Sequence, residues 1–269
     1  MAYHALIYDK LERVGRITLN RPRYRNAQST VLLKELDRAF DEAVGDDDVK
    51  VIILAGAGEH FSAGHDLGTP DEKENPSSYF NTKGIKKRHI GSWELFLDNT
   101  LRWRDLPKPT IAKIHGACLA GGLALAWSCD LIVASDDAFF ADAGARFDNI
   151  GIEYFAHPWQ MGPRFAKEFL FTARRVSAEQ ALAWGMVNRV VPREQLDEET
   201  TGLALEIAEA GRLGLALAKK AINHAEDLMG LRAGMDTAFA LHQLGHSHAG
   251  EVGAQLDPAA VKKSFAARS

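Results

Sequence analysis

Two glycine-containing segments that each follow an apolar run constrain the fold of this chain most. Residues 49–55 form a nearly continuous apolar run and lead to FSAGHDL at 61–67, while residues 110–117 lead to LAGGL at 119–123. The first run is typical of a strand that is buried on both faces. The second predicts a strand over 110–117, a buried helix over 121–129 and a further strand over 131–134. Strand, helix and strand with short joints indicate an α/β fold with parallel pairing.

Local signals outline the rest of the chain. Residues 5–20 alternate as in a β-hairpin, and Ser29 is placed to cap a helix whose apolar residues follow a helical period. Ser177 and Gln180 fit a capping box. From residue 196 onward the pattern is helical, with separations expected at Gly211, Gly230 and Gly245. The polar stretch 68–91 has the length and composition of a lid or loop, and no secondary structure is assigned to it.

Composition narrows the possible function classes. The 269 residues are 46% hydrophobic and 25% charged, with a formal net charge of -4, which is ordinary for a globular protein and gives no indication of nucleic-acid binding. Cys118 and Cys129 do not form a disulfide framework, so we expect reduced thiols. We see no signal peptide and no apolar run long enough for a membrane span, and we expect a cytoplasmic protein without a membrane partner.

The two glycine segments also suggest chemistry. Ligands of α/β proteins gather at the carboxyl ends of strands, and glycine allows a ligand to approach the backbone closely. The start of the predicted helix at Gly121 adds amides that lack a partner within the helix. Two such amides that converge on one carbonyl oxygen would form an oxyanion hole, in which one donor contributes about 3–4 kcal/mol to transition-state stabilisation. Alternatively, the glycines serve only to form turns.

Taken together, the motifs resemble the crotonase (enoyl-CoA hydratase/isomerase) superfamily. The matching segments occur in the family's order along most of the chain. They are NRP at 20–22 with NA at 26–27, VIILAG at 51–56, FSAGHDL at 61–67, KPTIA at 108–112 with Gly116 and AGG at 120–122, DLIVA at 130–134, and SAEQA at 177–181 with GMVN at 185–188.

This resemblance implies a spiral of ββα units over residues 1–195, which binds a CoA thioester, and a helical oligomerisation region over 196–269. It implies a homotrimer or a dimer of trimers, and no cofactor apart from the coenzyme A of an acyl-CoA or enoyl-CoA substrate. The oxyanion amides are assigned to His65 and Gly121. The residues assigned to substrate and CoA binding are Arg25, Ala27, Ala63, His65, Asp66, Leu67, Gly68 and Gly121.

The chain departs from the family at the two glutamates of a hydratase, because their positions hold Ala124 and Gly144. Neither residue can transfer a proton, which requires a titratable group. We therefore select Glu153 as the acid/base from its position in a loop that crosses the acyl group in the family, with Asp142 as the second candidate. Tyr154 and His157 are further candidates, although each could equally be a buried ring with a satisfied hydrogen bond.

Two classes of function remain open. In the first, the chain is an enzyme of the enoyl-CoA hydratase/isomerase type, with isomerase, hydrolase, dehydratase or decarboxylase chemistry as variants. In the second, it binds CoA esters without catalysis. His242, His246 and His248 could share a helix face, but no acidic or thiol partner lies near them in the sequence, so no metal is expected.

Overall fold

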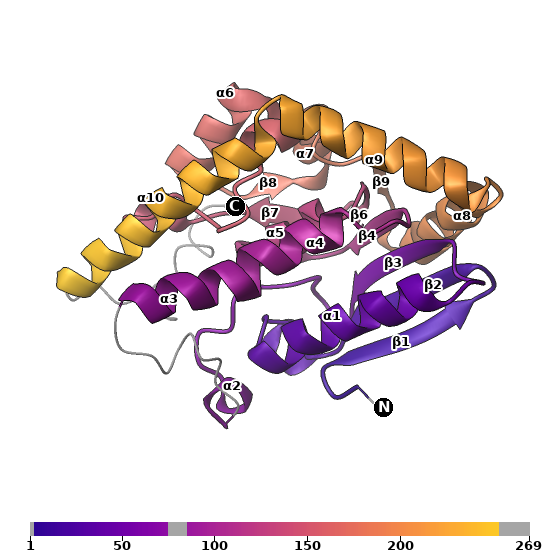
Figure 1. The fold of residues 1–269 in the computed structure, drawn as a ribbon, viewed down its shortest axis with the longest axis horizontal. Helices are drawn as coiled ribbons and strands as arrows, with labels where there is room; N and C mark the ends of the chain where they lie inside the picture. The colour runs from indigo at the N-terminus through magenta and orange to yellow at the C-terminus, as the bar shows by residue number, and fades with distance from the viewer. Residues whose placement is uncertain (1–2, 75–84, 253–269) are drawn as a thin grey trace.

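A six-stranded sheet forms the base of the molecule (Figure 1). The computed structural model describes residues 3–74 and 85–252, and the side chains of 85–88 are left out of the description. The strand order is β1-β2-β3-β4-β6-β9, and only the β1–β2 pair is antiparallel. The predicted hairpin, buried strand and α/β class are confirmed. The strands are β1 (Leu6–Leu11), β2 (Val14–Leu19), β3 (Val51–Gly56), β4 (Thr110–Ile114), β6 (Leu131–Ser135) and β9 (Arg189–Val191).

Helices cover both faces of this sheet. Helix α1 (Thr30–Gly45) begins where the side chain of Ser29 accepts a hydrogen bond from the Leu32 amide, as predicted, and its apolar face joins the main core. Helix α8 (Leu196–Ala208) packs its apolar residues against Val51, Ile53 and Val133 from the other face. Every residue of β3 is therefore buried, which explains its continuous apolar sequence.

A second, smaller sheet pairs short strands from successive segments of the chain. It contains β5 (Ala117–Leu119), β7 (Phe139–Ala141) and β8 (Val176–Ser177). The prediction of one strand over 110–117 was wrong, because Gly116, with φ of +53°, turns the chain between β4 and β5. Ser62 forms a parallel bridge with Cys118, which pairs with Phe140. This pairing brings the segments around residues 64, 120 and 142 to one edge.

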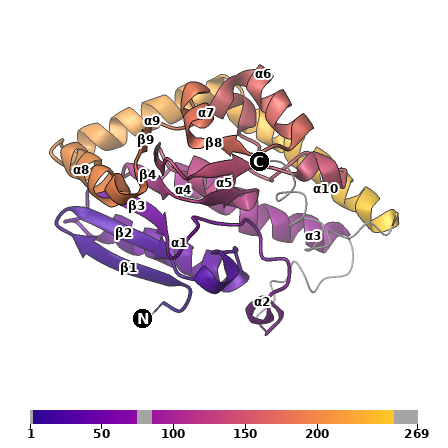
Figure 2. The ribbon, with the colours of Figure 1, turned by 180° about the vertical axis from the view of Figure 1, so that it is seen from behind.

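The remaining helices lie around the two sheets (Figure 2). The predicted capping box between Ser177 and Gln180 is confirmed. Gly245 does not end a helix as predicted, because it lies inside α10, where a Cβ atom would come within 2.7 Å of the Asp148 carbonyl oxygen. The helices are α2 (Pro70–Glu74), α3 (Ile85–Ser92), a π-helical segment (Trp93–Asp98), α4 (Asn99–Arg104), α5 (Gly121–Trp127), α6 (His157–Thr172), α7 (Ala178–Ala183), α9 (Arg212–Leu228) and α10 (Leu231–Glu251).

The polar stretch 68–91 contains α2 and the first turns of α3, and its middle, 75–84, lies outside the described residues. Phe239 of α10 packs edge-on against the rings of His89 and Trp93, so α10 contacts the helical segment at the end of this stretch. Within the described residues, no helix combines the length and apolarity needed to cross a membrane. Cys118 and Cys129 are both buried free thiols.

Candidate active site

The two glycine segments meet at the start of α5. Gly64 has φ of +93°, and a Cβ atom there would lie 2.8 Å from the Leu119 carbonyl oxygen and 3.0 Å from the Gly121 nitrogen. A Cβ atom on Gly121 would in turn lie 2.7 Å from Cε1 of His65. Glycine at both positions therefore lets the backbones and the imidazole come into contact. Ala120, directly before α5, has φ of +45°, a strained conformation for alanine that fixes the turn into the helix.

The backbone amides of His65 and Gly121 are not used by the fold. The hydrogen bonds on either side of His65 run from the Gln28 amide to the Gly64 carbonyl and from the Asp66 amide to the Gln28 carbonyl. Gly121 is the first residue of α5, where an amide has no acceptor within the helix. In the part of the chain that the structure describes, no hydrogen bond uses either amide. Both remain available to an external oxygen atom.

The side chain of His65 lies between Gln28 and Glu153. Its Nδ1 is 3.0 Å from Oε1 of Gln28, and its Nε2 is 2.9 Å from Oε2 of Glu153. Nε2 of Gln28 donates to the Gly121 carbonyl at 2.6 Å, which leaves Oε1 of Gln28 as an acceptor. The hydrogen of the imidazole therefore lies on Nδ1. A neutral ring with that tautomer can only accept at Nε2, and an ionised carboxylate can only accept as well. Nε2 can therefore donate to Glu153 only when the ring carries a second hydrogen.

Electrostatics keep the Glu153 carboxylate ionised. Burial by itself would raise the pKa of Glu153, but the positive charges of His65 and His242 and the hydrogen bonds from both rings outweigh it and hold the pKa well below its usual range. Burial lowers and the Glu153 charge raises the pKa of His242, and the net direction is upward. The carboxylate of Glu153, 3% exposed, is thus an ionised group held among histidines.

A small cavity lies beside this pair. Its volume is about 10 Å³, close to the space of one water molecule. Gln28, His65 and Glu153 line it together with Ala124. Ala124, where the sequence predicts the loss of a hydratase glutamate, therefore borders the same space as Glu153. Tyr154, buried at 2% exposure, lines the same cavity.

Asp142 lies in different surroundings. Its Oδ1 accepts a hydrogen bond from the Gly144 amide, and its Oδ2 is 3.3 Å from Nε2 of His157, whose side chain is fully buried. Asp142 is not among the residues that line the cavity, so the structure does not bring it next to His65. A Cβ atom on Gly144 would overlap the backbone nitrogen of Gly151, and a glutamate at 144 would therefore displace that loop.

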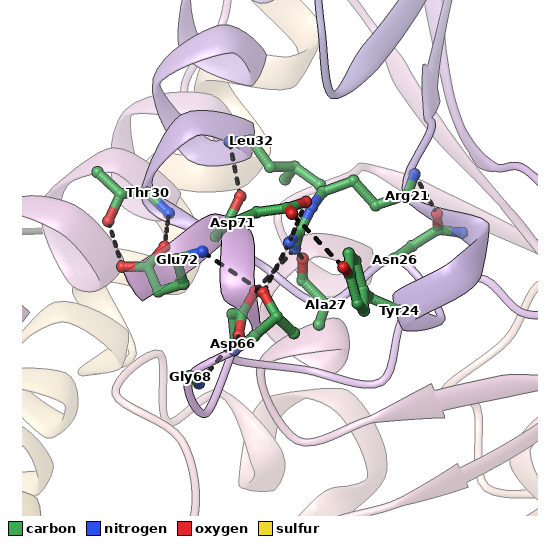
Figure 3. Close-up of polar contacts among 12 residues, drawn as sticks. Arg21, Tyr24, Asn26, Ala27, Thr30, Leu32, Asp66, Gly68, Asp71 and Glu72 are labelled. Atoms are coloured by element: carbon green, nitrogen blue, oxygen red, sulfur yellow. Dashed lines mark hydrogen bonds and ion pairs between the residues drawn. The ribbon is translucent and has the colours of Figure 1, made fainter. Parts of the chain in front are cut away.

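The Arg21 side chain holds the segment assigned to CoA binding through Asp66 (Figure 3). Its guanidinium lies 2.9 Å from the buried Asp66 carboxylate and donates to the Ala27 carbonyl. The same carboxylate accepts the amides of Gly68 and Thr69. The Asp66 side chain is thus fully engaged inside the protein, and its role is to shape the loop. The Arg25 carbonyl accepts the Ala63 amide, and the side chains of Arg25 and Leu67 are exposed.

Sequence reasoning missed two contributors to the site. Gln28 directly follows the Asn26-Ala27 motif and precedes the helix cap Ser29. A polar residue at this place in the sequence was the signal that could have identified it. His242 of α10 lies 3.3 Å from Oε1 of Glu153, and nothing in the sequence connects the two positions. The fold therefore brings a carboxylate, that of Glu153, next to His242, although none lies near this histidine in the sequence.

Comparison with known proteins identifies the family. The enoyl-CoA hydratase/isomerase family model matches residues 9–251. The chain belongs to this family. It is 46% identical over 252 residues, 89% of this chain and 79% of the relative, to "Putative enoyl-CoA hydratase EchA13" of Mycobacterium tuberculosis. The chain is accordingly an enzyme of the crotonase superfamily, and the sequence-based recognition is confirmed.

Solved structures agree with this assignment. A probable enoyl-CoA hydratase of Mycobacterium smegmatis superimposes with a TM-score of 0.86 at 45% identity, covering 94% of this chain and 98% of that one. An enoyl-CoA hydratase/isomerase of Xanthobacter autotrophicus Py2 gives 0.83 at 32% identity, covering 99% and 100%. The crotonase-like fold with a helical C-terminal region is therefore confirmed.

Proposed function

We propose that this enzyme transforms an acyl-CoA or enoyl-CoA thioester, with Glu153 as the group that transfers the proton. The observation that carries the proposal is the 2.9 Å contact between Nε2 of His65 and Oε2 of Glu153, beside a cavity that Ala124 also lines. Glu153 thereby supplies a carboxylate at the space from which the family's glutamate is missing. Its position in the chain differs, but its carboxylate is within reach of the same small volume.

The amides of His65 and Gly121 complete the proposed mechanism. Transfer of a proton to or from the carbon next to the thioester carbonyl passes through an enolate, whose negative charge lies on the thioester oxygen. Two amides to which no group among the described residues hydrogen-bonds are suited to hold that oxygen. Glu153 takes or returns the proton, and His65 holds the carboxylate in place through Nε2. Hydration and isomerisation both contain this step.

The remaining parts of the proposal concern binding and assembly. Arg25 to Ala27 and Ala63 to Gly68 would contact the CoA moiety, and no other cofactor is required. We also propose a cytoplasmic homotrimer or dimer of trimers. Large apolar side chains on the C-terminal helices support assembly, because solvent-exposed apolar patches of this kind usually mark interfaces. They include Leu213 at 72%, Leu217 at 57%, Leu228 at 76% and Leu244 at 65% exposure.

The test is a comparison of Glu153→Gln with Asp142→Asn. A panel of acyl- and enoyl-CoA esters is incubated with each protein and followed by mass spectrometry, with ultraviolet spectroscopy for isomerisation. Glu153→Gln should lower turnover by roughly 10²- to 10⁴-fold, the usual contribution of a general acid/base, while acyl-CoA still binds. Asp142→Asn serves as the matched buried carboxylate and should retain turnover.

Two results would count against the proposal. A fully active Glu153→Gln variant would remove Glu153 from the chemistry, and an inactive Asp142→Asn variant would transfer the role to Asp142. If the wild-type protein binds acyl-CoA esters but converts none of the panel, the non-catalytic binding alternative is favoured instead.

A further inference from the structure

Two histidines of α10 converge on the side of Glu153 that faces away from His65. His242 and His246 are one helical turn apart, and their Nε2 atoms lie 2.9 Å from each other. Oε1 of Glu153 lies 3.3 Å from Nε2 of His242. The three donor atoms, from a loop and from the C-terminal helix, all lie within 4.8 Å of one another.

Ordinary hydrogen bonding does not satisfy this arrangement well. Nε2 of His242 faces both the Glu153 oxygen and Nε2 of His246, yet it carries either one hydrogen or one lone pair. If it donates to Glu153, it has no lone pair for His246. If it accepts from His246, it has no hydrogen for Glu153. A cation placed among the three atoms would use a lone pair from each of them at once.

We propose that Glu153, His242 and His246 form a binding site for a divalent transition-metal ion of the Zn²⁺ class. Two imidazole nitrogens and one carboxylate oxygen are a ligand set that such ions favour, and two histidines one turn apart on a helix are a frequent way to present it. Donor atoms around tetrahedral zinc lie about 3.3 Å apart, given bonds of about 2.0–2.1 Å. The contacts of 2.9 Å and 3.3 Å are near this spacing, whereas the donor atoms of Glu153 and His246, which lie within 4.8 Å of each other, would move to it as an ion binds.

The burial of the three residues suits a site that is held firmly and can still be reached. Glu153 and His242 are 3% and 4% exposed, so packing fixes their orientation. His246 is partly exposed and provides the route for an ion from solvent. His248, on the same helix, is exposed and belongs to no such group among the described residues, which makes it a natural control.

The metal site and the proposed catalytic role use opposite oxygens of one carboxylate. Oε2 of Glu153 contacts His65, while Oε1 faces the α10 histidines. An ion on Oε1 would withdraw electron density from the carboxylate and make it a weaker proton acceptor. We therefore expect Zn²⁺ to suppress turnover. This consequence rests on the proposed function, whereas metal binding itself does not.

The experiment measures binding without any substrate. The full-length protein is stripped with a chelator, titrated calorimetrically with Zn²⁺, and assayed for metal content after dialysis. We expect about one equivalent of bound Zn²⁺ in the wild type. Glu153→Gln and His246→Gln should each weaken binding by at least about 100-fold, because even the outer partners of metal ligands contribute about 10- to 100-fold. His248→Gln should bind as the wild type does.

Cobalt substitution gives a second readout, since Co²⁺ in a site of low coordination number has visible absorption bands that are lost with its ligands. The proposal is overturned if the wild type takes up no more Zn²⁺ than His246→Gln, or if His248→Gln lowers binding equally. Circular dichroism confirms that each variant is folded, and the partly exposed His246 is the substitution least disruptive to packing. Because Glu153→Gln turnover is measured without metal, failure of the metal site leaves the acid/base proposal standing.

Discussion

Removal of the Arg21 guanidinium should destabilise the loop that carries His65. The side chains of Arg21 and Asp66 are 5% and 0% exposed and lie 2.9 Å apart. Arg21→Met preserves much of the volume but leaves a buried carboxylate without its cation, which typically costs about 3–5 kcal/mol. Asp66 keeps three hydrogen bonds, from the amides of Gly68 and Thr69 and from the Thr69 hydroxyl, so the lower end applies. We expect a loss of about 3 kcal/mol in the free energy of unfolding.

For a chain of this size, about 3 kcal/mol corresponds to a decrease in Tm of roughly 5–6 °C, measured by calorimetry. Arg23→Met is the matched control, because Arg23 is on the same turn but exposed, and it should change the stability by less than about 0.5 kcal/mol. Asp66→Asn completes a double-mutant cycle and should recover part of the loss in the Arg21→Met background. A change below about 1 kcal/mol for Arg21→Met would refute the reasoning.

Three further outcomes are expected. Gly121→Ala should displace the His65 ring, because the new Cβ atom would lie 2.7 Å from its Cε1. Turnover should fall strongly while the free energy of unfolding changes little, and binding and turnover equal to those of the wild type would contradict this. Burial, with help from nearby positive charge, lowers the pKa of His115 to about 4, so its contribution to stability is complete above pH 6.5 and is lost as the pH falls toward 4. This corresponds to at most about 3 kcal/mol, and His115→Gln should flatten that part of the stability–pH curve measured by urea unfolding. Ser177→Ala removes a cap that accepts the Gln180 amide and should lower the free energy of unfolding by about 1 kcal/mol, whereas no change would mean that the cap is replaced by water.

Local features of the fold could be predicted because their causes are local. Ser29 and Ser177 cap helices through hydrogen bonds to amides three residues further along, and both appear in the sequence as such. The strand over 51–56 is evident from apolar residues that need cover on both faces. The break at Gly116 could not be predicted, because the apolar pattern continues through it and only the pairing of β5 with β7 in a second sheet reveals the turn.

Candidate site residues divide in the same way. The segments around Gly64 and Gly121 are recognisable because each follows a strand, and stacking of the units places them in contact. Glu153 was selected from its position alone, and its contact with His65 remains support for a prediction that awaits the variant. The contact between Glu153 and His242 joins a loop to the last described helix, and no local pattern encodes such a distant pair.

The C-terminal helices do more here than the predicted oligomerisation region requires. Leu196 and Leu203 of α8 belong to the apolar layer beneath the main sheet, and α10 presents His242 to Glu153 within the same chain. Gly245 lets α10 approach the loop at Asp148, a few residues before Glu153. A substitution that shifted α10 would therefore alter the charge around Glu153 directly, without acting through a subunit contact. The protonation of the catalytic candidate is thus coupled to the packing of the last helix, so a change in α10 should affect turnover even where assembly is unchanged.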